Sequence, residues 1–145
     1  MVEFIEVTKK FGETTALENI SFKVESGEFV FVVGPSGSGK TTLIELILRN
    51  YLPTAGTIRI GGIELGDISK RKIPEYRRRI GVVFQDFRLL PDQTVFENVA
   101  LALRILSKGE PEIFEEVNEI LKSVGLEKKG DFFPAQLSAG ELQRT

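Results

Sequence analysis

Nine consecutive residues, 34–42, have the types and the order needed to hold a polyphosphate. They are Gly34, Pro35, Ser36, Gly37, Ser38, Gly39, Lys40, Thr41 and Thr42, which match the P-loop pattern G-x-x-x-x-G-K-[ST]. The three glycines allow unusual backbone angles, so successive N–H groups can point inward as an anion nest. Lys40 supplies a cation for the β- and γ-phosphates, Thr41 a hydroxyl for Mg²⁺, and Thr42 a contact to the α-phosphate. We therefore expect a nucleoside triphosphate with Mg²⁺ to bind at this motif; the alternative is a glycine-rich turn with a solvated lysine.

Two further groups of residues could contact phosphate or metal. Gln85 follows an apolar run that ends at Phe84, and ligands of open α/β sheets bind at the carboxyl ends of the strands. Its amide oxygen could therefore bind a metal, although a polar loop residue is the simpler interpretation. Ser138 and Glu141 have the spacing of a capping box at a helix start. That helix start could form a second phosphate site or serve only as a cap.

The P-loop requires a strand before it and a helix after it, and the patterning predicts both. Residues 29–33 are apolar without interruption, as in a strand that is buried on both faces of a parallel sheet, and residues 82–84 have the same character. Residues 20–24 alternate apolar and polar side chains, which predicts a half-buried strand, and residues 57–60 predict another. A helix with apolar side chains around most of its circumference is expected to begin near Gly39.

Helices are predicted in the second half of the sequence. Pro74 fits the first turn of a short helix. Thr94 and Glu97 form a capping-box pair before a longer one. The next helix is expected to begin at Pro111 and to end at Gly125, with an apolar stripe of Phe114, Val117, Ile120, Leu121 and Val124. Strand-like segments followed by helices predict an α/β fold.

Composition limits the class of protein. The chain of 145 residues, with 41% hydrophobic and 28% charged residues, fits one globular domain. Its net charge of −2 gives no general attraction to nucleic acid. Cysteine and histidine are absent, which excludes disulfides, thiolate zinc sites and the most common general base. Because we find neither a secretory signal nor an apolar run of membrane-spanning length, we expect a cytoplasmic protein.

Taken together, the P-loop, Gln85 and the segment L-S-A-G-E at residues 137–141 resemble the nucleotide-binding domain of ATP-binding-cassette (ABC) proteins. The resemblance covers nearly the whole chain. It implies an α/β P-loop NTPase fold of the ABC type. In that fold, residues 1–85 would form an antiparallel β subdomain and a parallel-sheet core. Residues 86–145 would form a helical subdomain with the signature, and the fold would be incomplete at the C-terminus.

The same resemblance implies ATP and Mg²⁺ as cofactors and assigns further roles. Phe11 takes the place of the aromatic residue, usually tyrosine, that stacks on adenine. Stacking does not involve the hydrogen-bonding edge of the base, so the residues themselves do not distinguish ATP from GTP as the ligand. Thr41 and Gln85 are the expected metal ligands, and Gln85 is also the candidate for positioning water. The signature of one copy would act on the ATP of a second copy in a head-to-tail dimer. It consists of Leu137, Ser138, Ala139, Gly140 and Glu141, with Ala139 in place of the usual glycine.

Residues 73–99 resemble the bacterial cell-division ABC proteins of the FtsE type, with lipoprotein-releasing and macrolide-export ATPases as alternatives. This branch implies an integral membrane partner of the FtsX type and a location on the inner face of the cell membrane. A cytoplasmic helix of that partner would dock near Gln85, unless the apolar residues there only close a small core: Phe87, Leu89, Leu90 and Pro91. The basic cluster within residues 70–79 indicates a solvated helix face or a contact with anionic lipid. No nucleic-acid partner is expected.

Relatives in this family continue beyond the signature with an acidic strand and a glutamate that polarises water. Neither is present up to Thr145, so we expect no catalytic residue within this chain besides the candidate Gln85, and very slow hydrolysis. The missing strand would leave an apolar edge around Phe31 and Val33, which predicts marginal stability or pairing with another copy. A chromosome-organising ATPase would need long coiled coils, and a small-molecule kinase would not need the signature. A nucleotide-binding fragment without hydrolysis remains an alternative.

Overall fold

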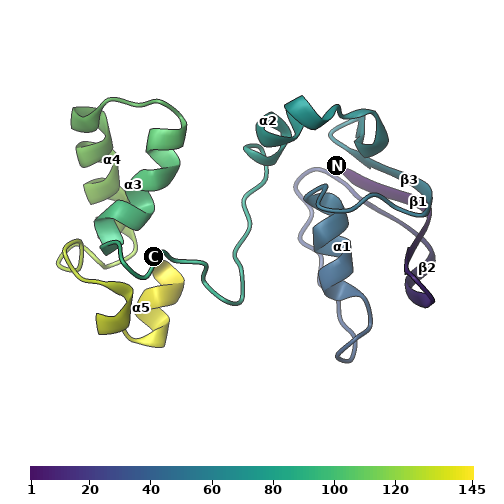
Figure 1. Ribbon diagram of the computed structural model, residues 1–145, viewed down its shortest axis with the longest axis horizontal. Helices are drawn as coiled ribbons and strands as arrows, with labels where there is room; N and C mark the ends of the chain where they lie inside the picture. Colours follow the sequence, from purple (N-terminus) through teal and green to yellow (C-terminus); the bar gives the residue numbers. More distant parts are fainter. The chain divides into compact units, whose positions relative to one another are not determined.

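The structure of residues 1–145, a computed structural model, divides into two units, Met1–Gly81 and Val82–Thr145, and each unit has its own core (Figure 1). None of the helices is long and apolar enough to span a bilayer.

An antiparallel sheet forms the first unit's framework. Its strands are β1 (Val2–Phe11), β2 (Thr14–Val24), β3 (Ala55–Ile60) and the short β4 (Ile63–Glu64), in the order β2-β1-β3-β4. Phe4 on the central strand β1 pairs with Phe22 on β2 and with Ile58 on β3, and the two phenyl rings stack with centroids 4.6 Å apart. The alternating pattern at residues 20–24 and the predicted strand at residues 57–60 are thus confirmed.

Helix α1 (Lys40–Ile47) contributes to the core of this unit. Leu43 and Leu46 are buried in one apolar cluster with residues of β1, β2 and β3, whereas Ile44 is exposed. The expectation that α1 would be buried around most of its circumference was therefore wrong on the Ile44 side. The chain continues through the 3₁₀ turns η1 (Leu65–Asp67) and η2 (Lys70–Lys72) to α2 (Ile73–Arg77). Helix α2 closes the C-terminus of α1, because the Tyr76 hydroxyl donates to the carbonyl of Ile47 at 2.5 Å.

The second unit is a helical hairpin with a short third helix. It contains α3 (Val95–Ile105), α4 (Glu110–Ser123), the turn η3 (Pro134–Gln136) and α5 (Ala139–Arg144). The side of α4 that enters the core carries Ile113, Val117 and Leu121. The predicted stripe was wrong at two positions, since Phe114 and Ile120 are exposed. The Phe114 ring lies against Phe96, with 5.9 Å between the ring centroids. The sequence pattern did not distinguish the two neighbouring apolar residues at positions 113 and 114.

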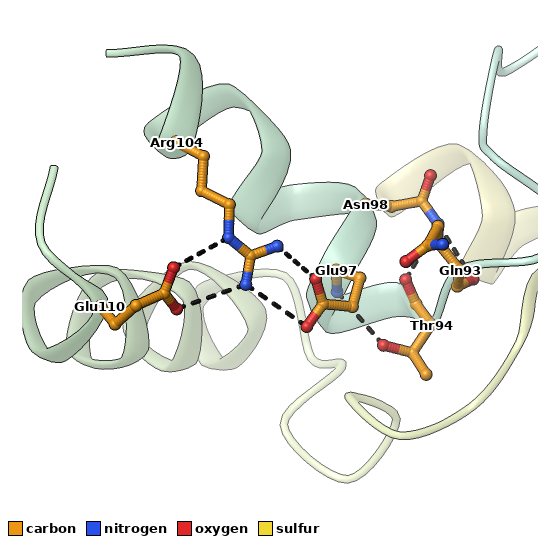
Figure 2. A network of polar contacts seen from close by, with 6 residues as sticks. All are labelled: Gln93, Thr94, Glu97, Asn98, Arg104 and Glu110. Atoms are coloured by element: carbon orange, nitrogen blue, oxygen red, sulfur yellow. Dashed lines mark hydrogen bonds and ion pairs between the residues drawn. The ribbon is translucent and has the colours of Figure 1, made fainter. Parts of the chain in front are cut away.

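An arginine on α3 links the two long helices of this unit (Figure 2). Arg104 pairs with Glu97 on its own helix and donates from Nε to Glu110 of α4 at 3.1 Å. The Thr94 hydroxyl accepts from the Glu97 N–H at 3.2 Å, as a cap should. The Glu97 carboxylate is paired with Arg104, and the reciprocal bond to the Thr94 backbone is not formed. The predicted capping box is therefore half formed.

Two predicted strands are absent. Residues 29–33 and 82–84 form no ladder with any strand, and most of their side chains are exposed. An extended segment becomes a strand only when a neighbouring strand satisfies its backbone N–H and C=O groups. All four strands of the sheet belong to the antiparallel part, and neither segment pairs with any of them. The two segments are apolar, as a buried strand requires, but they do not pair in a parallel sheet.

Candidate nucleotide-binding site

The glycine-rich loop before α1 is closed by its own lysine. The Lys40 ammonium (Nζ) donates to the carbonyl oxygens of Gly34 at 2.8 Å and Pro35 at 2.7 Å, and to the Ser38 hydroxyl at 3.3 Å. Lys40 is half-buried, whereas residues 34–38 are exposed. The loop therefore presents its backbone to solvent and holds a cation close to that backbone, where an incoming anion would meet it.

Two glycines of the loop are required by the backbone. Gly37 and Gly39 have φ angles of +83° and +86°, a region that residues with a Cβ rarely adopt. Gly39 is also closely packed, because a Cβ there would lie 2.6 Å from both the Ala16 carbonyl oxygen and the Leu17 side chain. The P-loop is thus seated against strand β2, and a larger residue at position 39 would have to displace that strand.

The N-terminus of α1 offers backbone donors beside the ammonium. Gly39 is the N-cap, no side chain caps the helix, and the first turn contains no acidic residue. The Leu43 N–H makes the first helical bond, to the Gly39 carbonyl at 3.0 Å. The N–H groups of Lys40, Thr41 and Thr42 therefore have no partner in the helix. Free donors, the positive end of the helix dipole and Lys40 together favour a bound anion.

The residues of this loop suit a magnesium ion that arrives with phosphates. No group of three acidic, histidine or cysteine side chains that could hold a metal ion by itself occurs in the chain. Mg²⁺ usually keeps several waters and is bound through few protein oxygens together with substrate phosphates. The exposed Thr41 on the first turn of α1 provides one such oxygen. The donor set therefore fits a metal that is shared with a ligand rather than a resident ion.

Phe11 lies in the same unit as the loop. It is the last residue of β1, pairs with Thr14, and its side chain is exposed. Leu17, which contacts Gly39 of the P-loop, pairs with Lys9, and Lys9 is two residues before Phe11. At about 3.3 Å per residue, Phe11 lies about 7 Å along the strand from this pair. The fold thus brings the predicted stacking residue to the region of the P-loop.

Gln85 belongs to the second unit. It is exposed in an irregular segment, and the guanidinium of the nearby Arg88 lies 3.7 Å from the centroid of the Phe84 ring. Because residues 82–84 form no strand, Gln85 is not at a strand end as predicted. Its role as a metal ligand stays a prediction.

The signature segment caps α5 in the second unit. The Ser138 hydroxyl donates to Glu141 Oε2 at 2.8 Å and accepts from the Glu141 N–H at 3.4 Å, and the Ser138 N–H donates to the same carboxylate at 2.8 Å. The predicted capping box is therefore confirmed. The bonds from Ser138, together with Lys129 at 3.3 Å, lower the pKa of Glu141 to about 2. Ala139 and Gly140 are exposed, and Leu137 packs against the core of this unit.

A glycine-rich loop of the pattern G-x-x-x-x-G-K-[ST] at a helix N-terminus is the signature of a P-loop nucleotide-binding protein. The ABC transporter family matches residues 17–145. The chain belongs to this family. This match confirms the fold class expected from the sequence. The structure is also similar to a dimeric ATP-binding cassette in a post-hydrolysis state, bound to ADP and Pi. That likeness has a TM-score of 0.87 and 39% identity and covers 99% of this chain and 66% of the other.

Two groups of curated relatives have comparable identity. The chain is 50% identical over 145 residues to the cell division ATP-binding protein FtsE of Bacillus subtilis strain 168, covering 99% of this chain and 64% of that protein. It is 41% identical over 148 residues to the methionine import ATP-binding protein MetN of Haemophilus influenzae strain 86-028NP, covering 99% of this chain and 43% of that protein. The chain thus spans less than two thirds of the length of either relative.

Several residues around the site are not evident from the sequence. Tyr51 lies beside Phe11 in the structure, although 40 positions separate them in the sequence, and no local pattern signals such a contact. Lys9 could have been predicted as a neighbour of Phe11, because residues two apart on a strand lie on the same face.

Some side chains of the basic cluster within residues 70–79 take part in bonds that hold the fold together. Arg77 donates to the Leu48 carbonyl at 2.8 Å, and Arg79 pairs with Glu75 at 3.4 Å.

Proposed function

We propose that this chain binds ATP with Mg²⁺ through residues 34–42, as the ATP-binding part of a membrane-associated ABC complex. The observation that carries the proposal is the position of Lys40. Its ammonium is held at the mouth of the loop by Gly34, Pro35 and Ser38, directly beside the free N–H groups of α1. A triphosphate would compete with the Gly34 and Pro35 carbonyls and the Ser38 hydroxyl for the three N–H donors of this ammonium. Membership of the ABC family supports ATP as the ligand.

Each part of the nucleotide has a candidate partner in this proposal. Lys40 and the loop N–H groups bind the β- and γ-phosphates, Thr42 the α-phosphate, and Thr41 the Mg²⁺ ion. Adenine stacks on Phe11, a contact worth about 1–3 kcal/mol. Enzymes transfer phosphoryl groups mainly by positioning the reactants and stabilising charge. In the full-length protein, Gln85 would position the metal or the attacking water.

The signature is proposed to act on the nucleotide of a second copy. The dimeric form of a cassette bound to ADP and Pi supports self-association. In a head-to-tail dimer, Ser138 and the Gly140 N–H of one copy would close on the γ-phosphate held by the other. ATP binding would then favour the closed dimer, and hydrolysis would open it. The division into a β and P-loop part, residues 1–85, and a helical part with the signature, residues 86–145, belongs to the same proposal.

We further propose that the complex acts in bacterial cell division, on the inner face of the cell membrane. The identity to FtsE supports this role, and an integral membrane partner of the FtsX type would accompany it. Phe87 and Leu90 have exposed apolar side chains that suit a docked helix of such a partner. Methionine import is the second candidate, because MetN proteins match the chain at similar identity.

Replacing Lys40 tests the nucleotide site. Lys40→Ala removes a charged donor, so ATP affinity in the presence of Mg²⁺ should fall about 10- to 150-fold by calorimetry. Lys10→Ala is the matched control, since Lys10 is an exposed lysine of the same unit with no side-chain partner. Equal ATP affinity in the Lys40→Ala protein and the unchanged chain would reject the P-loop assignment.

Depleting the full-length protein in its source bacterium tests the cellular role. A division role predicts long, undivided cells in rich medium. A growth defect that appears only when methionine is scarce would favour the import role instead.

A further inference from the structure

The segment of residues 70–79, which forms η2 and α2, concentrates positive charge in a chain that is negative overall. It contains six of the 19 basic residues and one acidic residue, Glu75, which together give a formal charge of +5. The other 13 basic and 20 acidic residues give −7 to the rest of the chain. A surface that serves only for solubility usually mixes both signs, so this separation of charge requires another explanation.

The fold accounts for two of the six cations. Arg77 donates to the Leu48 carbonyl at 2.8 Å, and the negative end of the α1 dipole favours a cation there. Arg79 pairs with Glu75 at 3.4 Å, although an ion pair as exposed as this one stabilises a fold little. The other four are exposed, and their side chains make no hydrogen bond or ion pair: Lys70, Arg71, Lys72 and Arg78. These four cations have no structural task.

A cavity of about 280 Å³ opens beside these cations. Its lining combines apolar and charged side chains: Ile63, Ile68 and Tyr76, with Lys72, Arg79, Asp67 and Glu75. The two carboxylates balance the two cations inside the cavity, so the surplus of positive charge lies around it, on Lys70, Arg71 and Arg78. Ile63 is 43% exposed. Cations that surround an exposed apolar side chain are typical of surfaces that contact the membrane interface.

The basic segment lies at the opposite end of α1 from the P-loop (Figure 1). Tyr76 donates to the carbonyl of Ile47, and Arg77 to that of Leu48, so both bind α2 to the C-terminus of α1. The P-loop precedes the N-terminus of the same helix, whose eight residues span about 12 Å. Phosphates held at the P-loop therefore do not reach these cations, and an anion that binds them is a different ligand.

We propose that the four free cations and Ile63 form a surface that binds the anionic headgroups of a lipid bilayer. This goes beyond the proposed function, since it needs neither the nucleotide nor an integral membrane partner. A bilayer offers negative charge to the cations and an apolar layer to Ile63. A nucleic acid would leave Ile63 unused, and single strands need aromatic rings on which bases stack. Tyr76, the one aromatic residue of the segment, is only 7% exposed.

Flotation of the whole chain with lipid vesicles tests the proposal, because membrane-bound protein rises in a density gradient whereas aggregates sink. The chain should float with vesicles of phosphatidylglycerol and phosphatidylcholine in equal parts, but not with phosphatidylcholine alone. Changing Lys70, Arg71 and Arg78 together to Gln should lower the vesicle affinity about 100-fold, at about 5-fold per charge. The matched control removes the same charge at exposed lysines without side-chain partners: Lys10→Gln, Lys122→Gln and Lys128→Gln.

Two results of this comparison would overturn the proposal. One is an equal loss of affinity in the two triple variants, and the other is no flotation of the unchanged chain with the anionic vesicles. Neither measurement uses ATP, so either result would leave the P-loop assignment standing.

The apolar contact and a duplex DNA probe distinguish lipid from nucleic acid. Ile63→Ser should lower the affinity for anionic vesicles about 3- to 10-fold without a change of charge. Ile120→Ser is the matched control, because Ile120 on α4 is also 43% exposed, and it should have no effect. DNA at the same phosphate concentration should bind more weakly than the vesicles. Tighter binding to DNA, or unchanged vesicle affinity in Ile63→Ser, would overturn the assignment to lipid.

Discussion

Single residues set the geometry of the phosphate loop. Gly39 meets two requirements at once, a φ of +86° and a contact with β2 that leaves no room for a side chain. Lys40 meets a third requirement, because its ammonium donates hydrogen bonds to loop carbonyls that would otherwise need water as a donor. The loop is therefore shaped before any ligand arrives, and its shape depends on the hairpin behind it.

Gly39→Ala should lower the unfolding free energy of the first unit by more than the cost of placing alanine at a positive φ angle. A Cβ at +86° costs about 1–2 kcal/mol, and the clash with the Ala16 carbonyl at 2.6 Å adds to it. Gly12→Ala is the matched control, since Gly12 also has positive φ, +56°, with nothing within 4 Å of the added methyl. Urea unfolding should show a larger loss of unfolding free energy for Gly39→Ala. Equal losses in the two variants would contradict the close packing of Gly39 against β2.

At the scale of elements, one asparagine orders the segment that enters α3. Asn98 accepts from the Leu90 N–H at 2.7 Å and donates to the carbonyls of Leu90, Gln93 and Thr94 at 3.1, 3.1 and 2.9 Å. Figure 2 shows this side chain beside Gln93 and Thr94. The turn at residues 90–94 is thereby attached to the helix that follows it, next to the proposed docking residues.

Asn98→Ala should release this turn and leave α3 in place. The Leu90 amide loses its acceptor, so its hydrogen exchange should accelerate, whereas buried amides of α3 should keep their rates. Asn118→Ala on α4 is the control, since the Asn118 side chain makes one bond, to the Phe114 carbonyl at 2.8 Å. If the Leu90 amide exchanged at the same rate in both variants, Asn98 would not be what holds the turn at residues 90–94.

The cap of α5 should respond to acid. Glu141 has a pKa of about 2, below the ordinary 4.5, chiefly through its bonds from Ser138. A lowered pKa means that the carboxylate stabilises the cap above about pH 4.5, and that this stabilisation is lost as the pH falls through about 2. The carboxyl carbon of Glu141 followed by NMR should titrate near that value, and Ser138→Ala should raise the midpoint. An unchanged midpoint in Ser138→Ala would show that Ser138 does not hold the carboxylate.

Local signals predicted most of the elements and motifs, but not whether the apolar runs at residues 29–33 and 82–84 would pair as strands. The P-loop, the α5 cap and the end of α4 at Gly125 depend on residues close in sequence, and the structure forms them where they were expected. The choice between Ile113 and Phe114 for the core depends on helix rotation, which an apolar pair leaves open. The contact between Phe11 and Tyr51 depends on where the chain goes after α1, which composition and periodicity do not specify.

For the whole molecule, the unpaired segment at residues 29–33 has the largest consequence. Its exposure alternates: Val30 and Val32 are 51% and 54% exposed, whereas Phe29, Phe31 and Val33 are 83%, 78% and 86% exposed. Val30 and Val32 line an apolar groove of about 340 Å³ beside α1. The segment is therefore arranged like a strand, with one face partly covered and the other open. Its five uncharged side chains and free backbone form an edge that can pair with another chain.

We expect the chain to associate through this edge at high concentration, and Phe31→Lys to reduce the association. A charge on the open face of an edge segment opposes pairing with another edge. The exposed Phe31 ring lies against Phe29, with 4.8 Å between the centroids. Ile105→Lys is the matched control, because Ile105 is also exposed but lies on a helix of the other unit. Sedimentation should show fewer dimers and larger species for Phe31→Lys than for Ile105→Lys. A single sharp monomer boundary for the unchanged chain at high concentration, with cooperative unfolding, would show that the edge is stable without a partner.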